Sequence, residues 1–195
     1  MSWNESRGKI AMEYYAVNGE APGGLGPTAV SHRDSQGLIV VDYLDLEFDV
    51  WLGGQFVVSE GCYAVTETLW NAMKSINLKG VSTRPMTVTP GDQLHLMYQG
   101  AIPCFLELVV PRSAIGEFEY KTRRRLIMQE DVDAEEQAEG EDQIILGKIE
   151  RQSIPEADMF SGRGLPLIVT SRVRDFLKNY GGVRLFRSHR VEVVG

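Results

Sequence analysis

Apolar residues and carboxylates alternate along residues 44–50. Leu44, Leu46, Phe48 and Val50 occupy the even positions, and Asp45, Glu47 and Asp49 occupy the odd positions between them. Successive side chains of a strand point to opposite faces, so this period of two predicts a half-buried strand whose carboxylates face outward. The acidic face then meets solvent, a basic protein partner, or a metal ion or substrate. A straight row of acids suits a metal poorly, because hard cations need converging oxygen ligands.

Further strands are predicted from short apolar runs and from the same alternation. These runs cover residues 94–98, 105–110, 118–128, 144–149 and 183–194. Residues 19–27 are rich in glycine and proline, and we expect them to be irregular. Strands therefore dominate the predicted structure.

Two stretches of the chain resemble each other. The matched positions, 104 residues apart, are Val65, Thr66, Leu69, Met73 and Lys74 in the first copy and Val169, Thr170, Val173, Leu177 and Lys178 in the second. In each copy a short apolar strand ends at a threonine that is suited to cap a helix. Apolar residues then recur at helical spacing, and a glycine closes the helix before a second extended stretch. Each copy is therefore predicted to be a strand–helix–strand unit.

These patterns together predict an α+β fold with a mostly antiparallel sheet and two similar strand–helix–strand units. With 195 residues, the chain is expected to form a single globular domain with halves at residues 1–112 and 113–195. The similarity between the halves is short. An internal duplication and convergence on a common turn–helix pattern therefore both stay open.

The net charge of −7 changes this picture at one segment. Residues 130–142 contain eight carboxylates and no lysine or arginine. A block of like charges with few apolar residues is typical of a mobile loop. We expect this loop either to be solvated or to meet a basic partner, and Asp131, Asp133, Glu135 and Glu136 are its candidate contact residues. Trp70 is a further candidate, since a partly exposed tryptophan on a helix is a good interface anchor.

The residues that usually carry catalysis form no known pattern. His32, His95 and His189 lack metal-ligand spacing, and no hydrolase, phosphate-binding or zinc motif occurs. We therefore predict no catalytic residue, no cofactor and no metal site. Cys62 and Cys104 are too few for a disulfide framework, and we expect both to be buried free thiols.

The location of the protein is predicted from what the sequence lacks. No apolar run approaches the roughly 20 residues of a membrane span, and residues 1–7 lack the apolar stretch of a secretory signal. We expect a cytoplasmic protein without membrane contact.

The repeat and its surroundings resemble the immunity protein 11 family, bacterial proteins linked to polymorphic toxins. The resemblance rests on Glu13-Tyr14-Tyr15-Ala16-Val17, on Val65-Thr66-Glu67-Thr68-Leu69, and on Asp158-Met159-Phe160 followed by Leu167-Ile168-Val169-Thr170-Ser171-Arg172-Val173. The chain departs from the late motif at Ser171, where the family has an acid, and keeps its basic residue at Arg172. The resemblance implies a cytoplasmic protein that neutralises a cognate toxin by binding it, and it implies no catalytic residues.

Three functions from different classes follow. The first is a protein that binds a basic toxin domain through its acidic surfaces. The second is an enzyme of unrecognised class acting on a small molecule, which needs a concave pocket with a perturbed acid or base. The third is a nucleic-acid-binding module, which the net charge of −7 makes unlikely.

Overall fold

The computed structural model describes residues 12–35, 39–123, 142–162 and 165–195. The strands are β1 (Tyr14–Asn18), β2 (Val30–Arg33), β3 (Ile39–Tyr43), β4 (Asp45–Phe48), β5 (Phe56–Ser59), β6 (Cys62–Thr66), β7 (Ser82–Pro85), β8 (Thr87–Pro90), β9 (Phe105–Val109), β10 (Gly116–Arg123), β11 (Asp142–Glu150), β12 (Met159–Phe160), β13 (Leu167–Thr170) and β14 (Arg187–Val194). The helices are α1 (Glu67–Met73), α2 (Leu94–Met97) and α3 (Ser171–Asn179), with 3₁₀ turns η1 (Lys74–Ile76) and η3 (Arg151–Ser153).

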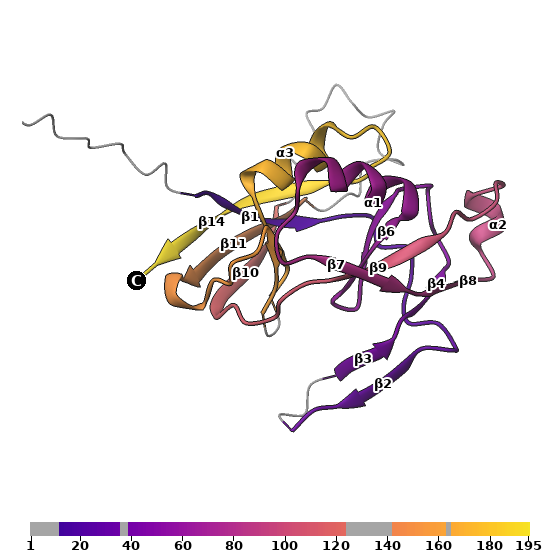
Figure 1. Cartoon of the computed structure of the whole chain (residues 1–195). Coiled ribbons are helices and arrows are strands. Elements are labelled where there is room, and N and C mark those ends of the chain that lie inside the picture. Colours follow the sequence, from indigo (N-terminus) through magenta and orange to yellow (C-terminus); the bar gives the residue numbers. More distant parts are fainter. Residues whose placement is uncertain (1–11, 36–38, 124–141, 163–164) are drawn as a thin grey trace, which may run out of the picture.

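Two sheets form the body of the molecule (Figure 1). One has the strand order β10-β11-β14-β1-β13-β12, and the other has the order β5-β6-β9-β7. Neighbouring strands in both sheets are antiparallel except for β11 and β14, which are parallel. Two smaller pairs, β2-β3 and β4-β8, complete the strands. The predicted α+β class is confirmed, with mixed and antiparallel sheets.

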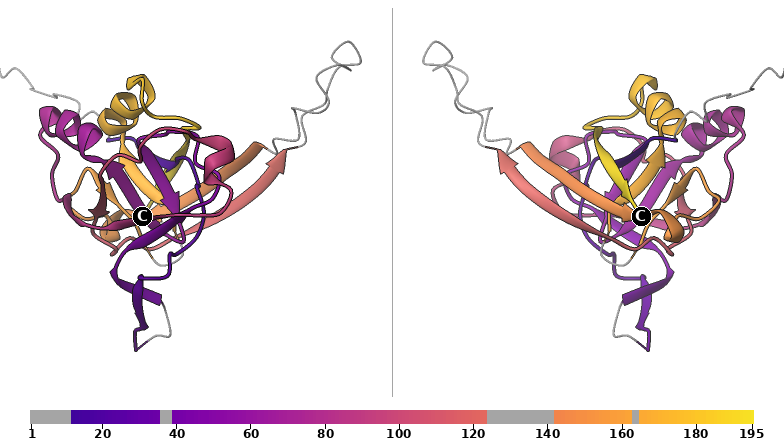
Figure 2. Two further views of the ribbon diagram at one scale, coloured as in Figure 1. Left: turned by 90° about the vertical axis from the view of Figure 1, so that its right-hand side faces the viewer. Right: turned by 90° about the vertical axis from the view of Figure 1, so that its left-hand side faces the viewer.

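Helices α1 and α3 lie side by side on one side of the sheets (Figures 1 and 2). Each begins directly after a buried strand, and each buries two residues four positions apart, which lie on one helical face. These residues are Leu69 and Met73 in α1 and Val173 and Leu177 in α3. The helical spacing predicted from the sequence is therefore confirmed.

The two capping threonines behave differently. The Thr66 side chain accepts a hydrogen bond from the Leu69 amide at 3.2 Å, as expected of an N-cap. Thr170 stands at the equivalent position of α3 but makes no capping hydrogen bond. Its hydroxyl donates instead to the Asp158 carboxylate at 3.2 Å. The predicted cap is thus correct for α1 and wrong for α3.

The two sheets contain one shared arrangement of strands. In the four-stranded sheet, β6 lies between β5 and β9, and β9 lies between β6 and β7. In the larger sheet, β13 lies between β12 and β1, and β1 lies between β13 and β14. With α1 following β6 and α3 following β13, the equivalent elements are β5 and β12, β6 and β13, α1 and α3, β7 and β14, and β9 and β1. Only the last pair differs in chain order. β1 belongs to the second unit in space, although in the sequence it lies in the half expected at residues 1–112.

The backbone hydrogen bonds repeat residue by residue. The Thr66 amide donates to the Gln55 carbonyl at 2.9 Å, and the Thr170 amide donates to the Asp158 carbonyl at 3.0 Å. The next backbone amide in each unit donates to the carbonyl of the residue just before β9 or β1. The Glu67 amide donates to the Cys104 carbonyl at 3.0 Å, and the Ser171 amide donates to the Glu13 carbonyl at 3.1 Å. The register therefore matches in both units.

Each unit also contacts the other in the same way. The Gln55 amide donates to the carbonyl of Gly182, which follows α3, at 2.8 Å. The Asp158 amide donates to the carbonyl of Lys79, which follows α1 and η1, at 3.0 Å. The main core fills the space between the units with residues from both, including Phe56, Tyr63, Val65, Leu69 and Met73 and their counterparts Met159, Leu167, Val169, Val173 and Leu177.

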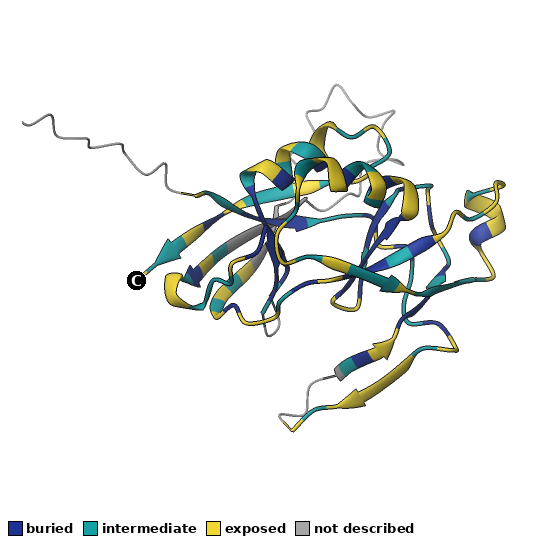
Figure 3. Ribbon diagram, viewed as in Figure 1, coloured by how far each residue is buried: buried dark blue, intermediate teal, exposed yellow. Residues whose placement is uncertain are grey.

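Two hairpins extend from this body. The β2-β3 pair points away from both sheets, and all four residues of β2 are exposed (Figure 3). The β10-β11 pair runs outward on another side (Figure 2), with Arg123 opposite Asp142 at its end. These two strands confirm the strand predicted at residues 144–149 and the one predicted at residues 118–128 as far as Arg123, while residues 124–128 lie outside the described residues.

One predicted strand is wrong. Residues 94–98 form the short helix α2 and its C-cap instead. Leu94 is buried, whereas Leu96 and Met97 are exposed. The alternation of Leu94, Leu96 and Tyr98 therefore has no meaning as a strand pattern.

Candidate functional site

The row of acids at residues 45–49 is not the outward face that its alternation predicts. Asp45 is fully buried. Its carboxylate accepts hydrogen bonds from the Thr28 amide at 2.9 Å, the Thr28 hydroxyl at 2.7 Å and the Thr89 hydroxyl at 3.0 Å. Asp45 therefore holds three segments together and is not available to a partner.

The acids on β4 do not form an open outward face because both edges of the strand are covered. One edge of the strand pairs with β8. Along the other edge, the Gly26 backbone amide donates to the Asp45 carbonyl. The backbone amides of Glu47 and Asp49 donate to the carbonyls of residues 24 and 22. The glycine- and proline-rich segment covers the strand in this way. Glu47 and Asp49 remain half-buried.

Trp70 lies on α1 and is half-buried, as expected. It packs against the main core, and the Lys74 ammonium lies 5.9 Å from the centre of its ring. The candidate contact residues Asp131, Asp133, Glu135 and Glu136 lie outside the described residues.

The strands beside this acidic segment form a charged surface. Glu117, Lys148 and Glu192 stand opposite one another on β10, β11 and β14, and Glu119 and Arg190 lie two residues along the same faces of their strands. All five are exposed; we call them the open sheet face. Lys148 pairs with Glu192 at 3.5 Å, and Arg190 pairs with Glu13 at 2.8 Å. Acids and bases thus alternate there.

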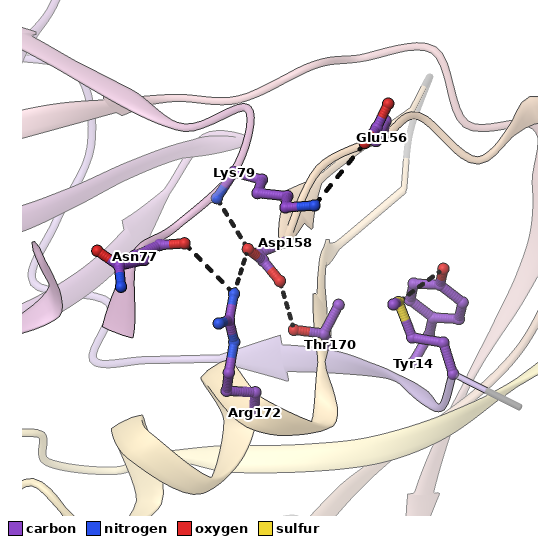
Figure 4. Close-up of polar contacts among 8 residues, drawn as sticks. Tyr14, Asn77, Lys79, Glu156, Asp158, Thr170 and Arg172 are labelled. Carbon is purple, nitrogen blue, oxygen red and sulfur yellow. Dashed lines mark hydrogen bonds and ion pairs between the residues drawn. The ribbon is translucent and has the colours of Figure 1, made fainter. Parts of the chain in front are cut away.

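The late sequence motif gathers at Asp158 (Figure 4). The Asp158 carboxylate accepts hydrogen bonds from the Arg172 guanidinium at 2.6 Å, the Lys79 amide at 2.8 Å and the Thr170 hydroxyl at 3.2 Å. Glu156 lies nearby, 3.8 Å from the Lys79 ammonium. Asp158 and Arg172 belong to the second unit and Lys79 to the first, so this cluster is a joint between the units, with its buried carboxylate already satisfied.

The two cysteines differ in their surroundings. Cys62 is buried, and burial raises the pKa of its thiol. Cys104 is exposed. The expectation that both are buried is therefore correct only for Cys62.

An open hollow of about 700 Å³ lies beside the end of β14. Tyr14, Arg151 and Arg190 are among the residues that line it. Arg190 is paired with Glu13, and Arg151 donates to the Gly195 carbonyl at 3.1 Å. Burial raises the pKa of Tyr14. The Tyr14 hydroxyl donates to the Met12 sulfur at 3.3 Å. Each of these polar groups thus has its own partner, and their arrangement does not define a reaction.

The sequence missed one surface. Residues 49–54 lie against residues 91–98, with the Trp51 and Tyr98 rings 4.4 Å apart. Val50 and Leu52 are each 40% exposed, Leu96 is 70% exposed and Met97 is 53% exposed. We call these four apolar residues, with Asp49 and Asp92, the α2 surface. One sequence feature could have indicated this surface. Leu96 and Met97 are two consecutive large apolar residues in a stretch without lysine or arginine.

The described residues contain neither a metal-binding cluster nor a membrane-spanning helix. No group of three or more histidine, cysteine, aspartate or glutamate side chains in residues 12–35, 39–123, 142–162 and 165–195 could hold a metal ion. None of the helices in those ranges is long and apolar enough to cross a membrane.

Comparisons with known proteins do not place the chain in a family. No family model matches it, and neither a curated protein nor a solved structure is significantly similar. The resemblance to the immunity protein 11 family therefore stays a hypothesis.

Proposed function

We propose that this chain is a cytoplasmic binding protein that neutralises a basic toxin domain by direct association, as the resemblance to immunity proteins implies. The distribution of charge carries the proposal. Residues 34–73 contain seven carboxylates and neither lysine nor arginine, and residues 130–142 contain eight carboxylates and no base. Complementary charge speeds the encounter of two proteins and selects the partner.

The structure supports this assignment by showing where the acids lie. Among the seven carboxylates, Asp42, Glu60 and Glu67 are exposed, and Glu47 and Asp49 are half-buried. Only Asp45 is fully buried. The acids of residues 34–73 therefore contribute to the surface and are not mainly internal hydrogen-bond acceptors.

The proposal requires a toxin gene beside the gene of this chain, and the test is titration of the chain with the toxic domain which that gene encodes. We expect one-to-one binding by calorimetry at about 50 mM salt, and a dissociation constant at least about tenfold higher at about 300 mM salt. We also expect the chain to abolish the toxicity of that domain. Absence of binding at low salt contradicts the proposal, and salt-independent binding contradicts its electrostatic basis.

The equivalent strands and hydrogen bonds of the two units also support an internal duplication. We propose that an ancestral unit was duplicated and that the second copy is circularly permuted, so that β1 takes the place that β9 has in the first unit. Chance convergence on strand, turn and helix explains the short sequence similarity, but it does not explain the matched register of β9 and β1.

A permuted chain tests this proposal. Residues 19–195 are followed by a short glycine–serine linker and residues 12–18, which places β1 after β14 in the order of the first unit. We expect its free energy of unfolding to be within about 1 kcal/mol of that of residues 12–195 in natural order. The matched control lacks residues 12–18. A permuted chain no more stable than this control contradicts the assignment of β1 to the second unit.

A further inference from the structure

The α2 surface combines an apolar centre with acids at its edge. Of the ten large apolar residues that are exposed in the described part of the chain, four belong to it: Val50, Leu52, Leu96 and Met97. Large apolar side chains grouped on a surface mark interaction sites, whereas single ones are ordinary. The two segments that carry these four residues lie against each other, with the Trp51 and Tyr98 rings 4.4 Å apart, whereas Ile115 and Leu185 lie on other parts of the chain.

The loop that carries Val50 and Leu52 is firmly held. The buried Glu20 carboxylate accepts hydrogen bonds from the amides of Leu52 and Gly54, the latter at 2.8 Å. The Trp51 indole donates to the Gly54 carbonyl at 2.9 Å. A surface fixed in this way loses little conformational entropy when a partner binds.

The second segment is fixed against the first. The Gly91 amide donates to the Phe48 carbonyl at 2.9 Å, and a side chain at Gly91 would collide with Asp49. Leu94 anchors α2 in a core that also contains Trp51. The exposed Leu96 and Met97 are thus presented by a helix whose third apolar residue is buried.

The two segments that form this surface carry acids and no bases. Residues 34–73 and 85–111, which contain both segments of the α2 surface, include no lysine or arginine. Asp92 is exposed and Asp49 and Glu47 are half-buried. A centre of apolar contacts inside a polar rim is the usual anatomy of a protein interface.

We infer that the α2 surface is where a basic protein partner docks, with an apolar side chain of the partner against Leu96 and Met97 and with its lysines or arginines facing Asp49 and Asp92. This inference rests on the proposed function for the identity of the partner. It adds the surface, which neither the sequence patterns nor the family resemblance indicates.

The open sheet face is the competing surface. It also carries exposed acids, but Lys148 and Arg190 are interspersed among Glu117, Glu119 and Glu192. Among the side chains that the structure describes on these strands, at residues 116–119, 147–150 and 187–194, none is a large apolar residue that is exposed. The open sheet face therefore lacks the single sign of charge found along the segments of the α2 surface.

The experiment compares variants by calorimetry with the same toxin domain. We expect the double variant Leu96→Ala/Met97→Ala to weaken binding at least about tenfold, because it removes the apolar centre. Asp92→Lys should also weaken binding and reduce its dependence on salt. Matched controls are Ile115→Ala, which removes an equally exposed apolar residue elsewhere, and Glu117→Lys, which reverses a charge on the open sheet face. Both controls should bind like the unmodified chain.

The results separate this inference from the proposed function. Because the changed side chains are exposed, we expect each variant to keep the thermal unfolding temperature of the unmodified chain. Measuring that temperature shows whether each variant is folded. If the unmodified chain binds and Leu96→Ala/Met97→Ala binds equally well, the α2 surface is not the docking site while the proposed function stands. Loss of binding in Glu117→Lys alone also overturns the inference, in favour of the open sheet face. If the unmodified chain does not bind, both proposals fail.

Discussion

Replacing Arg84 by methionine should destabilise the protein by about 3 kcal/mol. Arg84 on β7 faces Glu107 on β9, and its guanidinium donates to both carboxylate oxygens at 2.6 and 2.8 Å and to the Val41 carbonyl at 2.7 Å. These hydrogen bonds raise the pKa of Arg84. The Glu107 side chain is only 6% exposed, so Arg84→Met leaves a buried carboxylate without its cation. Arg84 itself is 38% exposed, which places the loss at the lower end of the range for buried pairs.

Urea unfolding measures this loss, and a second substitution identifies its cause. Adding Glu107→Leu to Arg84→Met removes the stranded charge, so the double variant should be more stable than Arg84→Met. A deficit below about 1 kcal/mol at neutral pH contradicts this account of the pair.

Replacing Asp158 by alanine should cost about 2–3 kcal/mol of the free energy of unfolding. The substitution removes three acceptor contacts and leaves the Lys79 amide without its carboxylate partner. Because Lys79 and Asp158 belong to different units, the loss weakens the joint between them. Chemical denaturation provides the measurement, with the same method as for Arg84.

The neighbouring Glu156 is the matched control for this joint. Its side chain is 92% exposed and lies 3.8 Å from the Lys79 ammonium. A surface ion pair of this kind contributes little, because water and salt screen it. Glu156→Ala should therefore unfold like the unmodified chain. Equal losses for the two variants would mean that the buried hydrogen bonds of Asp158 do not hold the units together.

Local patterns predicted the local elements well. The threonine, the helical spacing of Leu69 and Met73, and the matching residues of the second unit were enough to place α1 and α3. The apolar run at residues 105–110 predicted β9. The helical spacing succeeds because one-sided burial acts over only a few residues. Caps were less reliable, since Thr170 does not cap α3 and the C-caps of η1 and α3 are Asn77 and Tyr180, not the glycines predicted to close the helices.

Contacts between distant residues were not predictable in the same way. The alternation around Asp45 indicates an outward carboxylate, but its partners Thr28 and Thr89 lie 17 and 44 residues away. Nothing in the local pattern of β1 shows that it pairs with β13 and β14. Short alternation is also ambiguous, and at Leu94, Leu96 and Tyr98 the chain forms a single helical turn.

The candidate site shows the same division. Sequence reasoning favoured an acidic partner-binding protein and selected Asp49, which belongs to the α2 surface, and Glu47, two residues before it. It did not select Leu96 and Met97, because the exposure of an apolar residue depends on how the whole chain packs. The proposal of a basic partner rests on charges along the sequence, whereas the proposed docking surface rests on the fold.

The most direct test of a docked basic partner is hydrogen–deuterium exchange of the full chain, with and without a saturating amount of the toxin domain encoded beside its gene. We expect slower exchange in residues 49–54 and 91–98 on binding, with residues 116–123 unchanged. Slower exchange confined to residues 116–123, or no change anywhere in the chain, would contradict docking at the α2 surface.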